Sequence, residues 1–410
     1  MEYLILKFFG FSDPAGYSVV NSIPKESSLE AALEDVVLIL VAIFLVAPLG
    51  ISSLAQTPAD AVGFEQQGKL PEAEHLWQAI IQRNPQDAGA FASLGVVLSR
   101  EQKYPEAAAA YRKALALQPR LPGVQLNLGL AEFKQGHFQA AIAPLTRALA
   151  ADPKSTQART LLGLSYYGAK RFAEAIRHLQ PAAEADPGNT ELQQTLAQSC
   201  LRAKHYDCAV KEFRQIVQRN PDSAAAHILM GEALDGLGRT PDAIAEFQAA
   251  AKATPPDPNA HFGLGYLYWK SHQYDDAKRE FEEQLTLDPG NAQALAYLGD
   301  IAWKQNDEDE AIGRLQRAVK LRGDIRIAYV DLGAVLTQQK RYPEALAALR
   351  QAVKLDASQP DAHYRLGRVY QAMGNNAAAE KEFAQVRRLH EKAEEDMATK
   401  MSAAGSAPQR

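Results

Sequence analysis

The chain has 410 residues, of which 47% are hydrophobic and 23% are charged. Its 44 Lys and Arg residues are outnumbered by 49 Asp and Glu residues, which argues against a nucleic-acid partner because such proteins usually carry a basic excess. Two cysteines, Cys200 and Cys208, are too few for a disulfide framework or a four-ligand zinc site. A single globular core does not grow to this length, so the chain contains several domains or consists of repeats.

An apolar segment lies near the start of the chain. Val36 to Ala47 is unbroken, which suits the core of a signal peptide, and Ser53-Leu54-Ala55 offers small residues for cleavage before Gln56. Extended to nineteen residues, the segment is also long enough to span a bilayer. We therefore expect residues 36–55 to be a signal peptide or a transmembrane segment, and the sequence leaves both alternatives open.

Residues 1–35 do not resemble the positively charged start of a signal peptide. They hold Lys7 and Lys25 against six acidic residues, which leaves the true start codon open. We expect this segment to be poorly ordered. The hydrophobic segment predicts an exported or membrane-anchored protein, periplasmic or otherwise extracytoplasmic, with membrane contact only through residues 36–54.

From about residue 54 onwards the sequence repeats with a period of 34 residues. Glycines mark one register, and we number each repeat so that this glycine is position eight; Ala197 fills the only gap between the second and tenth repeats. A second register, position twenty, is alanine in all ten repeats, and position twenty-four is aromatic or Leu. The glycines are Gly95, Gly129, Gly163, Gly231, Gly265, Gly299, Gly333 and Gly367, and the alanines run from Ala73 to Ala379.

This pattern resembles the tetratricopeptide repeat (TPR), met ten times in residues 54–393. The resemblance implies an all-α fold, a right-handed superhelical solenoid of antiparallel helix pairs. Small residues at positions eight and twenty let the two helices of a pair approach closely where they cross. A single pair cannot bury its apolar stripe, so stability must come from stacking of neighbouring repeats.

The residues at the start of each first helix indicate where that helix begins. A residue able to cap a helix precedes many of the first helices, and we expect proline at the first helical position in three repeats, at Pro122, Pro258 and Pro360. In the first repeat, Thr57-Pro58-Ala59-Asp60 predicts a capped start to a shortened, degenerate unit. The expected caps are Asp87, Ser155, Asn189, Ser223, Asp257 and Asn291.

The last repeat is followed by a charged stretch that predicts a C-terminal helix extension over residues 394–401. The small residues of the 402–410 tail predict disorder.

No catalytic, cofactor-binding or metal-binding motif occurs, so we expect a non-enzymatic protein without a cofactor. His227, His261 and His363 share position four, and we interpret them as core-edge residues because histidines alone make a poor metal site. Cys200 and Cys208 flank one hairpin turn, where a disulfide and a pair of buried thiols remain alternatives.

The resemblance implies a protein-protein interaction scaffold that binds a peptide or protein partner in the concave groove of the superhelix. One alternative is a membrane-tethered accessory factor for cell-envelope assembly or secretion. Another is a regulatory subunit of a glycosyltransferase-like enzyme, although the asparagines that recur in the grooves of such arrays are missing here. The oligomeric state cannot be inferred.

Positions two, five, nine and twelve of each first helix form a stripe separate from the core-facing positions, and in the family this stripe lines the groove. Position thirteen adds cations along one margin. We expect apolar anchors beside these cations, although the aromatic residues at position twelve could instead pack on the next first helix. The predicted groove residues are Leu126, Leu130, Phe133, Lys134, Leu164, Tyr167, Arg202, Phe262, Tyr266, Trp269, Lys270, Trp303 and Lys304.

Overall fold

The computed structural model describes residues 57–254 and 257–405, with side chains as far as Thr399. The predictions for residues 1–35 and for the apolar segment 36–55 fall outside the described residues, as does the end of the chain from 406. Within the described ranges all twenty regular elements are α-helices, and none combines the length and apolarity needed to cross a bilayer.

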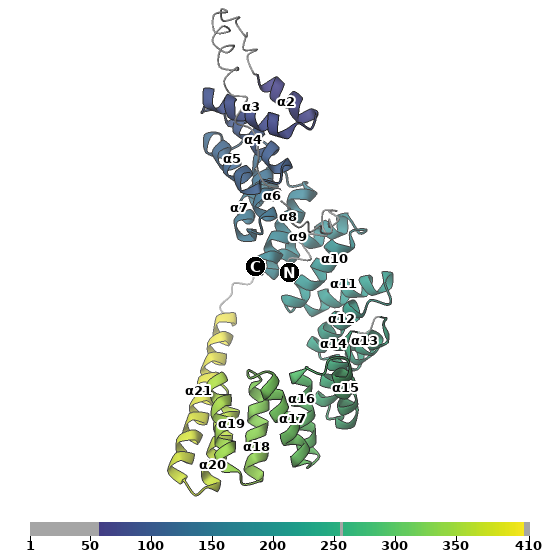
Figure 1. Ribbon diagram of the computed structural model, residues 1–410, viewed down its shortest axis with the longest axis vertical. Coiled ribbons are helices and arrows are strands. Elements are labelled where there is room, and N and C mark those ends of the chain that lie inside the picture. The colour runs from purple at the N-terminus through teal and green to yellow at the C-terminus, as the bar shows by residue number, and fades with distance from the viewer. Residues whose placement is uncertain (1–56, 255–256, 406–410) are drawn as a thin grey trace, which may run out of the picture. The chain divides into compact units, whose positions relative to one another are not determined.

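Apart from α10 and α11, consecutive helices pack in pairs, each consisting of the first and the second helix of one repeat (Figure 1). The first helices are α2 (Pro58–Gln66), α4 (Ala88–Arg100), α6 (Val124–Lys134), α8 (Thr156–Gly168), α10 (Thr190–Arg202), α12 (Ala224–Gly236), α14 (Pro258–Lys270), α16 (Ala292–Lys304), α18 (Arg326–Gln338) and α20 (Pro360–Ala372). The second helices are α3 (Leu70–Arg83), α5 (Tyr104–Leu117), α7 (Phe138–Ala151), α9 (Phe172–Ala185), α11 (Tyr206–Arg219), α13 (Thr240–Lys252), α15 (Tyr274–Leu287), α17 (Glu308–Leu321), α19 (Tyr342–Leu355) and α21 (Asn376–Gly405).

The predicted all-α architecture of stacked helix pairs is confirmed. The chain divides between Ser199 and Cys200, inside α10, into two compact units. In the second unit the first helices α12, α14, α16, α18 and α20 contact one another in succession, so one layer of first helices runs through five repeats.

The helix crossing within each repeat follows the predicted small-residue positions. A Cβ atom added to Gly231 would lie 2.8 Å from the ring of Phe247, the residue at position twenty-four of the same repeat. Ala243, at position twenty, is fully buried beside it. The same arrangement recurs at Gly163 and Leu179, where the added atom would lie 2.6 Å from a methyl group. The glycine register therefore marks a close contact between the two helices of each pair.

The six expected caps all accept a hydrogen bond from a backbone amide in the first turn, as Ser223 does from Ala226. Thr57 and Asp60 form a capping box on the short helix α2. Pro258 and Pro360 occupy the first helical position as predicted.

The prediction for Pro122 was wrong, because α6 begins only at Val124. Leu121, at the repeat position where the other repeats carry their caps, has no hydrogen-bond acceptor in its side chain, and the N-cap of α6 is instead Gly123, in a left-handed conformation with φ of 74°. The first turn is therefore not capped by a side chain and starts two residues later than in the repeats that begin with Pro258 or Pro360.

Position fifteen, in the turn between the paired helices, has a positive φ in all ten repeats. Four of these residues are glycine, whereas the others include Lys170, Lys204 and Lys340, with φ between 57° and 60°. The turn closes with the hydrogen bond of a Schellman motif, for example from the amide of Lys103 to the carbonyl of Leu98, at 2.9 Å. The sequence analysis did not identify this register because six of its ten members carry side chains.

The last helix, α21, is the longest. It continues through the predicted extension at 394–401 to Gly405, so its final turn includes the first four residues of the segment for which the sequence predicts a disordered tail. Ala403 and Ala404 favour helix strongly, which accounts for the later end.

Candidate partner-binding surface

In the first unit, the predicted groove residues lie on α6 and α8, which contact each other. Leu126, Leu130 and Tyr167 are half-buried, whereas Phe133 and Leu164 are buried at 7% and 8% exposure. The hydroxyl of Tyr167 donates a hydrogen bond of 2.6 Å to Gln198 in α10. Lys134 is half-buried at the end of α6, and burial lowers the pKa of its ammonium group.

In the second unit, side chains from four successive first helices line one pocket of about 520 Å³. The helices α14, α16, α18 and α20 each contribute, and the pocket contains the predicted residues Trp269, Trp303 and Lys304. Its lining is Trp269, Ala296, Tyr297, Asp300, Trp303, Lys304, Asn306, Ile327, Asp331, Gln338 and Arg365. We call it the α14–α20 pocket.

A neighbouring pocket of about 500 Å³ lies between α12 and α14. The predicted residues Phe262 and Tyr266 form part of its wall together with Leu229 and Phe247. We call it the α12–α14 pocket. Two acids of α12, Glu232 and Asp235, also line it, and burial raises the pKa of Glu232.

Trp269 combines the two roles that the sequence left as alternatives. Its indole ring lies 5.0 Å from the ring of Tyr297, and its Nε1 donates a hydrogen bond of 2.5 Å to Asp300, both on the next first helix. The ring is nevertheless only half-buried and lines the α14–α20 pocket. Trp303 similarly donates a hydrogen bond of 2.5 Å to Gln338 on the next first helix.

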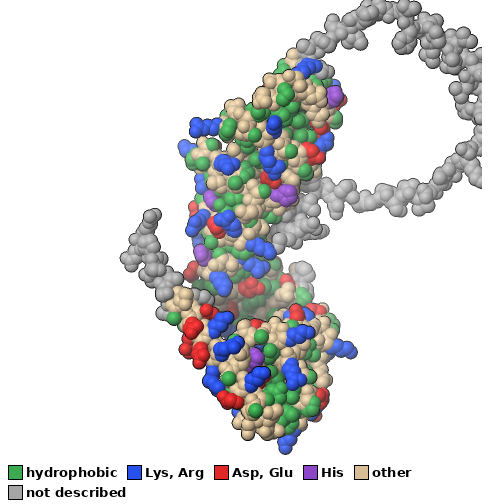
Figure 2. Space-filling view, turned by 90° about the vertical axis from the view of Figure 1, so that its left-hand side faces the viewer, with side chains coloured by type: hydrophobic (Ala, Val, Ile, Leu, Met, Phe, Trp, Pro, Cys, Tyr) green, Lys and Arg blue, Asp and Glu red, His purple; other side chains and the backbone are tan. Residues whose placement is uncertain are grey.

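The predicted cations at position thirteen are largely neutralised in the second unit. Lys270 pairs with Asp235 at 2.8 Å, and Lys304 pairs with Asp300. The ammonium group of Lys304 also lies 5.4 Å from the centre of the Trp269 ring. Arg202 is exposed and lines neither pocket. On the face drawn in Figure 2, basic and acidic side chains are likewise interspersed.

Asp331 is a member of the α14–α20 pocket that the sequence analysis did not select. It is 6% exposed, and burial together with the nearby Asp300 raises the pKa of its carboxyl group to about 7, against the opposing effect of Arg365 and Lys304. One signal was visible in the sequence: Asp331 and Arg365 are the only charged residues at position six in repeats two to ten. Tyr297, also at position six, has a pKa raised to about 12 by burial, so it stays a neutral hydroxyl.

The histidines at position four form hydrogen bonds within their own repeats. Nδ1 of His227 lies 2.7 Å from Glu246, and the same pairing joins His261 to Glu280 and His363 to Glu382. These pairs tie the first helix of a repeat to its second helix. Across the described ranges, no group of three or more His, Cys, Asp or Glu side chains is arranged to hold a metal ion.

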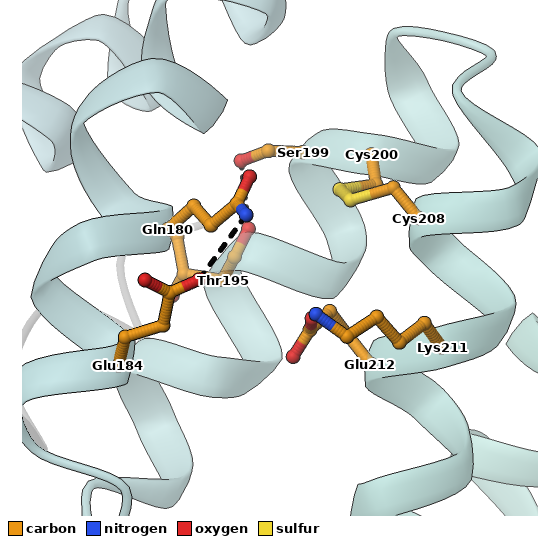
Figure 3. The surroundings of a disulfide bond; sticks show 8 residues. All are labelled: Gln180, Glu184, Thr195, Ser199, Cys200, Cys208, Lys211 and Glu212. Carbon is orange, nitrogen blue, oxygen red and sulfur yellow. Dashed lines mark hydrogen bonds and ion pairs between the residues drawn. A yellow bond between two sulfur atoms is a disulfide. The ribbon is translucent and has the colours of Figure 1, made fainter.

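Cys200 and Cys208 form a disulfide that joins the end of α10 to the first turn of α11 (Figure 3). Their Cα atoms are 5.7 Å apart, and Cys200 is fully buried. Of the two alternatives left by the sequence, the structure contains the disulfide.

Family profiles match segments along most of the repeat array. The family profile described as "Tetratricopeptide repeat" matches residues 61–122, 126–190, 195–258 and 262–324, and related profiles match 166–217, 333–374 and 361–393. No curated protein sequence matches the chain.

Several solved structures are similar. The crystal structure of the APC/C hetero-tetramer Cut9-Hcn1 covers 80% of this chain and 72% of its own, with 16% identity and a TM-score of 0.48. That of YrrB, described as a TPR protein with an unusual peptide-binding site, covers 46% and 97%, with 23% identity and a TM-score of 0.37. The structure of yeast Tom70 covers 85% and 94%, with 15% identity and a TM-score of 0.40.

Proposed function

Because this chain belongs to the tetratricopeptide repeat family, we propose that it is a non-enzymatic scaffold that binds a peptide or protein through the first helices of repeats six to ten. The observation that carries the proposal is the α14–α20 pocket, to which four successive repeats each contribute side chains. A pocket built in this way suits an extended ligand better than a compact one, because its lining advances along the array from helix to helix.

The chemistry of the lining supports a polypeptide ligand. Trp269, Tyr297 and Trp303 combine large apolar surface with polar groups, and such aromatic side chains contribute much of the binding energy in protein interfaces. Helix α14 contributes Phe262 and Tyr266 to one pocket and Trp269 to the other, so a bound chain can reach both. Ile327, which lines the α14–α20 pocket, is 44% exposed and gives such a chain an accessible apolar contact.

Site-specific photocrosslinking tests the proposal. A photoreactive amino acid placed at Ile327 should capture a specific partner in the native cell. The matched control is Leu321, an exposed apolar residue at the end of α17 that lines neither pocket. Equal capture at both positions, or capture at Leu321 alone, would contradict binding at the first-helix surface.

We also propose that the chain is exported or membrane-anchored, with residues 36–55 as its signal or anchor. Two independent features support this: the apolar run from Val36 to Ala47, and the disulfide between Cys200 and Cys208. Disulfides persist in oxidising compartments and are rare in the cytosol. The same features favour, as a second candidate function, a membrane-tethered accessory factor for cell-envelope assembly or secretion.

Fractionation of cells that express the full-length chain tests export. We expect the protein in the membrane or extracytoplasmic fraction, with Cys200 and Cys208 protected from a thiol-alkylating reagent until a reductant is added. A cytosolic protein whose two thiols react without reduction would refute the proposal.

A further inference from the structure

The sequence suggested free cations beside the two pockets, but the structure pairs them with acids. Lys270 and Lys304, the expected cationic margin, are held by Asp235 and Asp300. Two further acids, Glu232 in the α12–α14 pocket and Asp331 in the α14–α20 pocket, take part in no ion pair within the described residues. Arg365, which lines the α14–α20 pocket, also takes part in no ion pair among the described residues, so the groups of the two linings without an ion pair include these two acids and one cation.

Asp331 is the more informative of the two because it is buried. Its carboxylate is 6% exposed and lines the pocket, and among the described residues no hydrogen bond or ion pair engages it. Burying a carboxylate without a partner is costly, since the surroundings do not replace the water that solvated it. A ligand that supplied a positively charged donor would remove this cost.

The charged groups around Asp331 do not fill that role themselves. On α16, Lys304 is bound to Asp300. On α20, the guanidinium group of Arg365 lies 5.0 Å from the centre of the Trp303 ring, and Asp361 forms an ion pair of 2.6 Å with Arg326 of α18. Lys304 is thus paired with another acid, whereas Arg365 contacts the Trp303 ring and acts on Asp331 through its charge without a hydrogen bond or ion pair to it.

We propose that the α14–α20 pocket takes a basic side chain, lysine or arginine, from the partner polypeptide, with Asp331 as its counter-ion. This inference rests on the proposed function and names the chemistry of the partner at that site. The aromatic groups of Tyr297 and Trp303 suit the same ligand, because long basic side chains lay their aliphatic stems against apolar surface while the charged end reaches a polar group. Glu232 of the α12–α14 pocket, which takes part in no ion pair among the described residues, favours a second basic residue in the same partner.

The chain provides its own spectroscopic probes. Of its three tryptophans, Trp269 and Trp303 line the pocket, whereas Trp77 is buried at 4% exposure in the first unit. The full-length protein labelled with 5-fluorotryptophan can therefore be titrated with Nα-acetyl-arginine N-methylamide or Nα-acetyl-lysine N-methylamide and followed by fluorine NMR. The citrulline analogue, which is neutral and nearly isosteric with arginine, is the matched control ligand.

We expect saturable shifts of the Trp269 and Trp303 signals with a basic probe, none at Trp77, and at least tenfold weaker binding of the citrulline analogue. Asp331→Asn, which keeps the shape of the side chain, should weaken binding of the basic probe by about tenfold or more, as loss of a charge-assisted hydrogen bond does. Asp324→Asn, at an exposed site before α18, should leave binding unchanged.

Equal binding of the arginine and citrulline probes, an unaltered affinity in Asp331→Asn, or no saturable shift with either basic probe would overturn the inference. These outcomes are distinct from failure of the proposed function. A partner captured at Ile327 whose binding does not depend on basic residues would leave the scaffold in place and remove only the role of Asp331.

Discussion

The indole Nε1 of Trp269 donates a hydrogen bond of 2.5 Å to Asp300, 31 residues later on the next first helix. The hydroxyl of Tyr167 reaches Gln198 across the same spacing, from position twelve of one repeat to position nine of the next. Position twelve therefore joins neighbouring first helices in both units. An aromatic residue at this position contributes to stacking of the repeats as well as to the exposed surface.

Trp269→Ala should lower the free energy of unfolding by about 2–3 kcal/mol, because it removes a ring packed on Tyr297 as well as a hydrogen bond. Trp269→Phe keeps most of the packing and should cost about 1 kcal/mol. Urea denaturation of both variants measures the difference. If Trp269→Ala were as stable as the parent, the indole would not stabilise the contact between repeats seven and eight.

Gly231→Leu should destabilise the protein by roughly 1–3 kcal/mol or more, because the new side chain would meet the ring of Phe247 at the helix crossing. Gly313→Ala is the matched control: Gly313 lies in α17 with no atom within 4 Å of an added Cβ. That change should stabilise the helix by about 0.5–1 kcal/mol. A melting temperature for Gly231→Leu within a degree of the parent would contradict the close crossing.

Most features that depend on one repeat could be predicted from the sequence, with the start of α6 and the positive φ at position fifteen as exceptions, whereas charge pairings between repeats could not. The glycine and alanine registers and the caps act within a few residues or within one helix pair, so the 34-residue pattern contains them. By contrast, the pKa of Asp331 depends on Asp300 and Lys304 from the repeat before it and on Arg365 from the repeat after it. Likewise, the pairing of Lys270 with Asp235 spans two repeats, so the sequence suggested free cations there.

Position fifteen offers a test of stored backbone strain. Lys340 has a φ of 57°, a conformation that costs a residue with a side chain about 1–2 kcal/mol relative to the usual helix. Lys340→Gly should therefore raise the free energy of unfolding by up to about 1 kcal/mol, after allowing for the extra freedom of glycine in the unfolded chain. Gly238→Ala, at the same position with φ of 73° and open space around it, should lower it by about 1 kcal/mol. The same sign of change in both variants would count against strain at this turn.

Trp303→Ala should weaken binding of a partner captured at Ile327 by about 2 kcal/mol, because the indole lines the α14–α20 pocket and contacts the guanidinium group of Arg365. The variant also removes the hydrogen bond from Trp303 to Gln338, so its affinity should be measured at a temperature at which its melting curve shows it to be fully folded. Leu321→Ala, outside both pockets, is the control for nonspecific effects on affinity. Unchanged affinity in Trp303→Ala would place the binding surface elsewhere.

The raised pKa of Asp331 predicts a specific dependence of stability on pH. Burial raises this pKa from 3.8 to about 7, so between these values the folded chain holds a proton that the unfolded chain has released. The folded state binds more protons in that window, and its stability therefore falls as the pH rises through it. Above about pH 7 Asp331 is ionised in both the folded and the unfolded state, and the stability that its protonation contributed is fully lost.

Asp331→Asn removes this titration while keeping the size of the side chain. The variant and the parent should have similar free energies of unfolding near pH 4, where the carboxyl group is largely neutral in the folded state. The variant should become progressively more stable than the parent up to about pH 7, by on the order of a few kcal/mol, because the parent must then bury a charge. Urea denaturation of both proteins at a series of pH values measures this difference, in which the titration of every other group largely cancels. A difference that is constant with pH would mean that Asp331 is ionised at no extra cost in the folded state, and that the pocket does not withhold water from it.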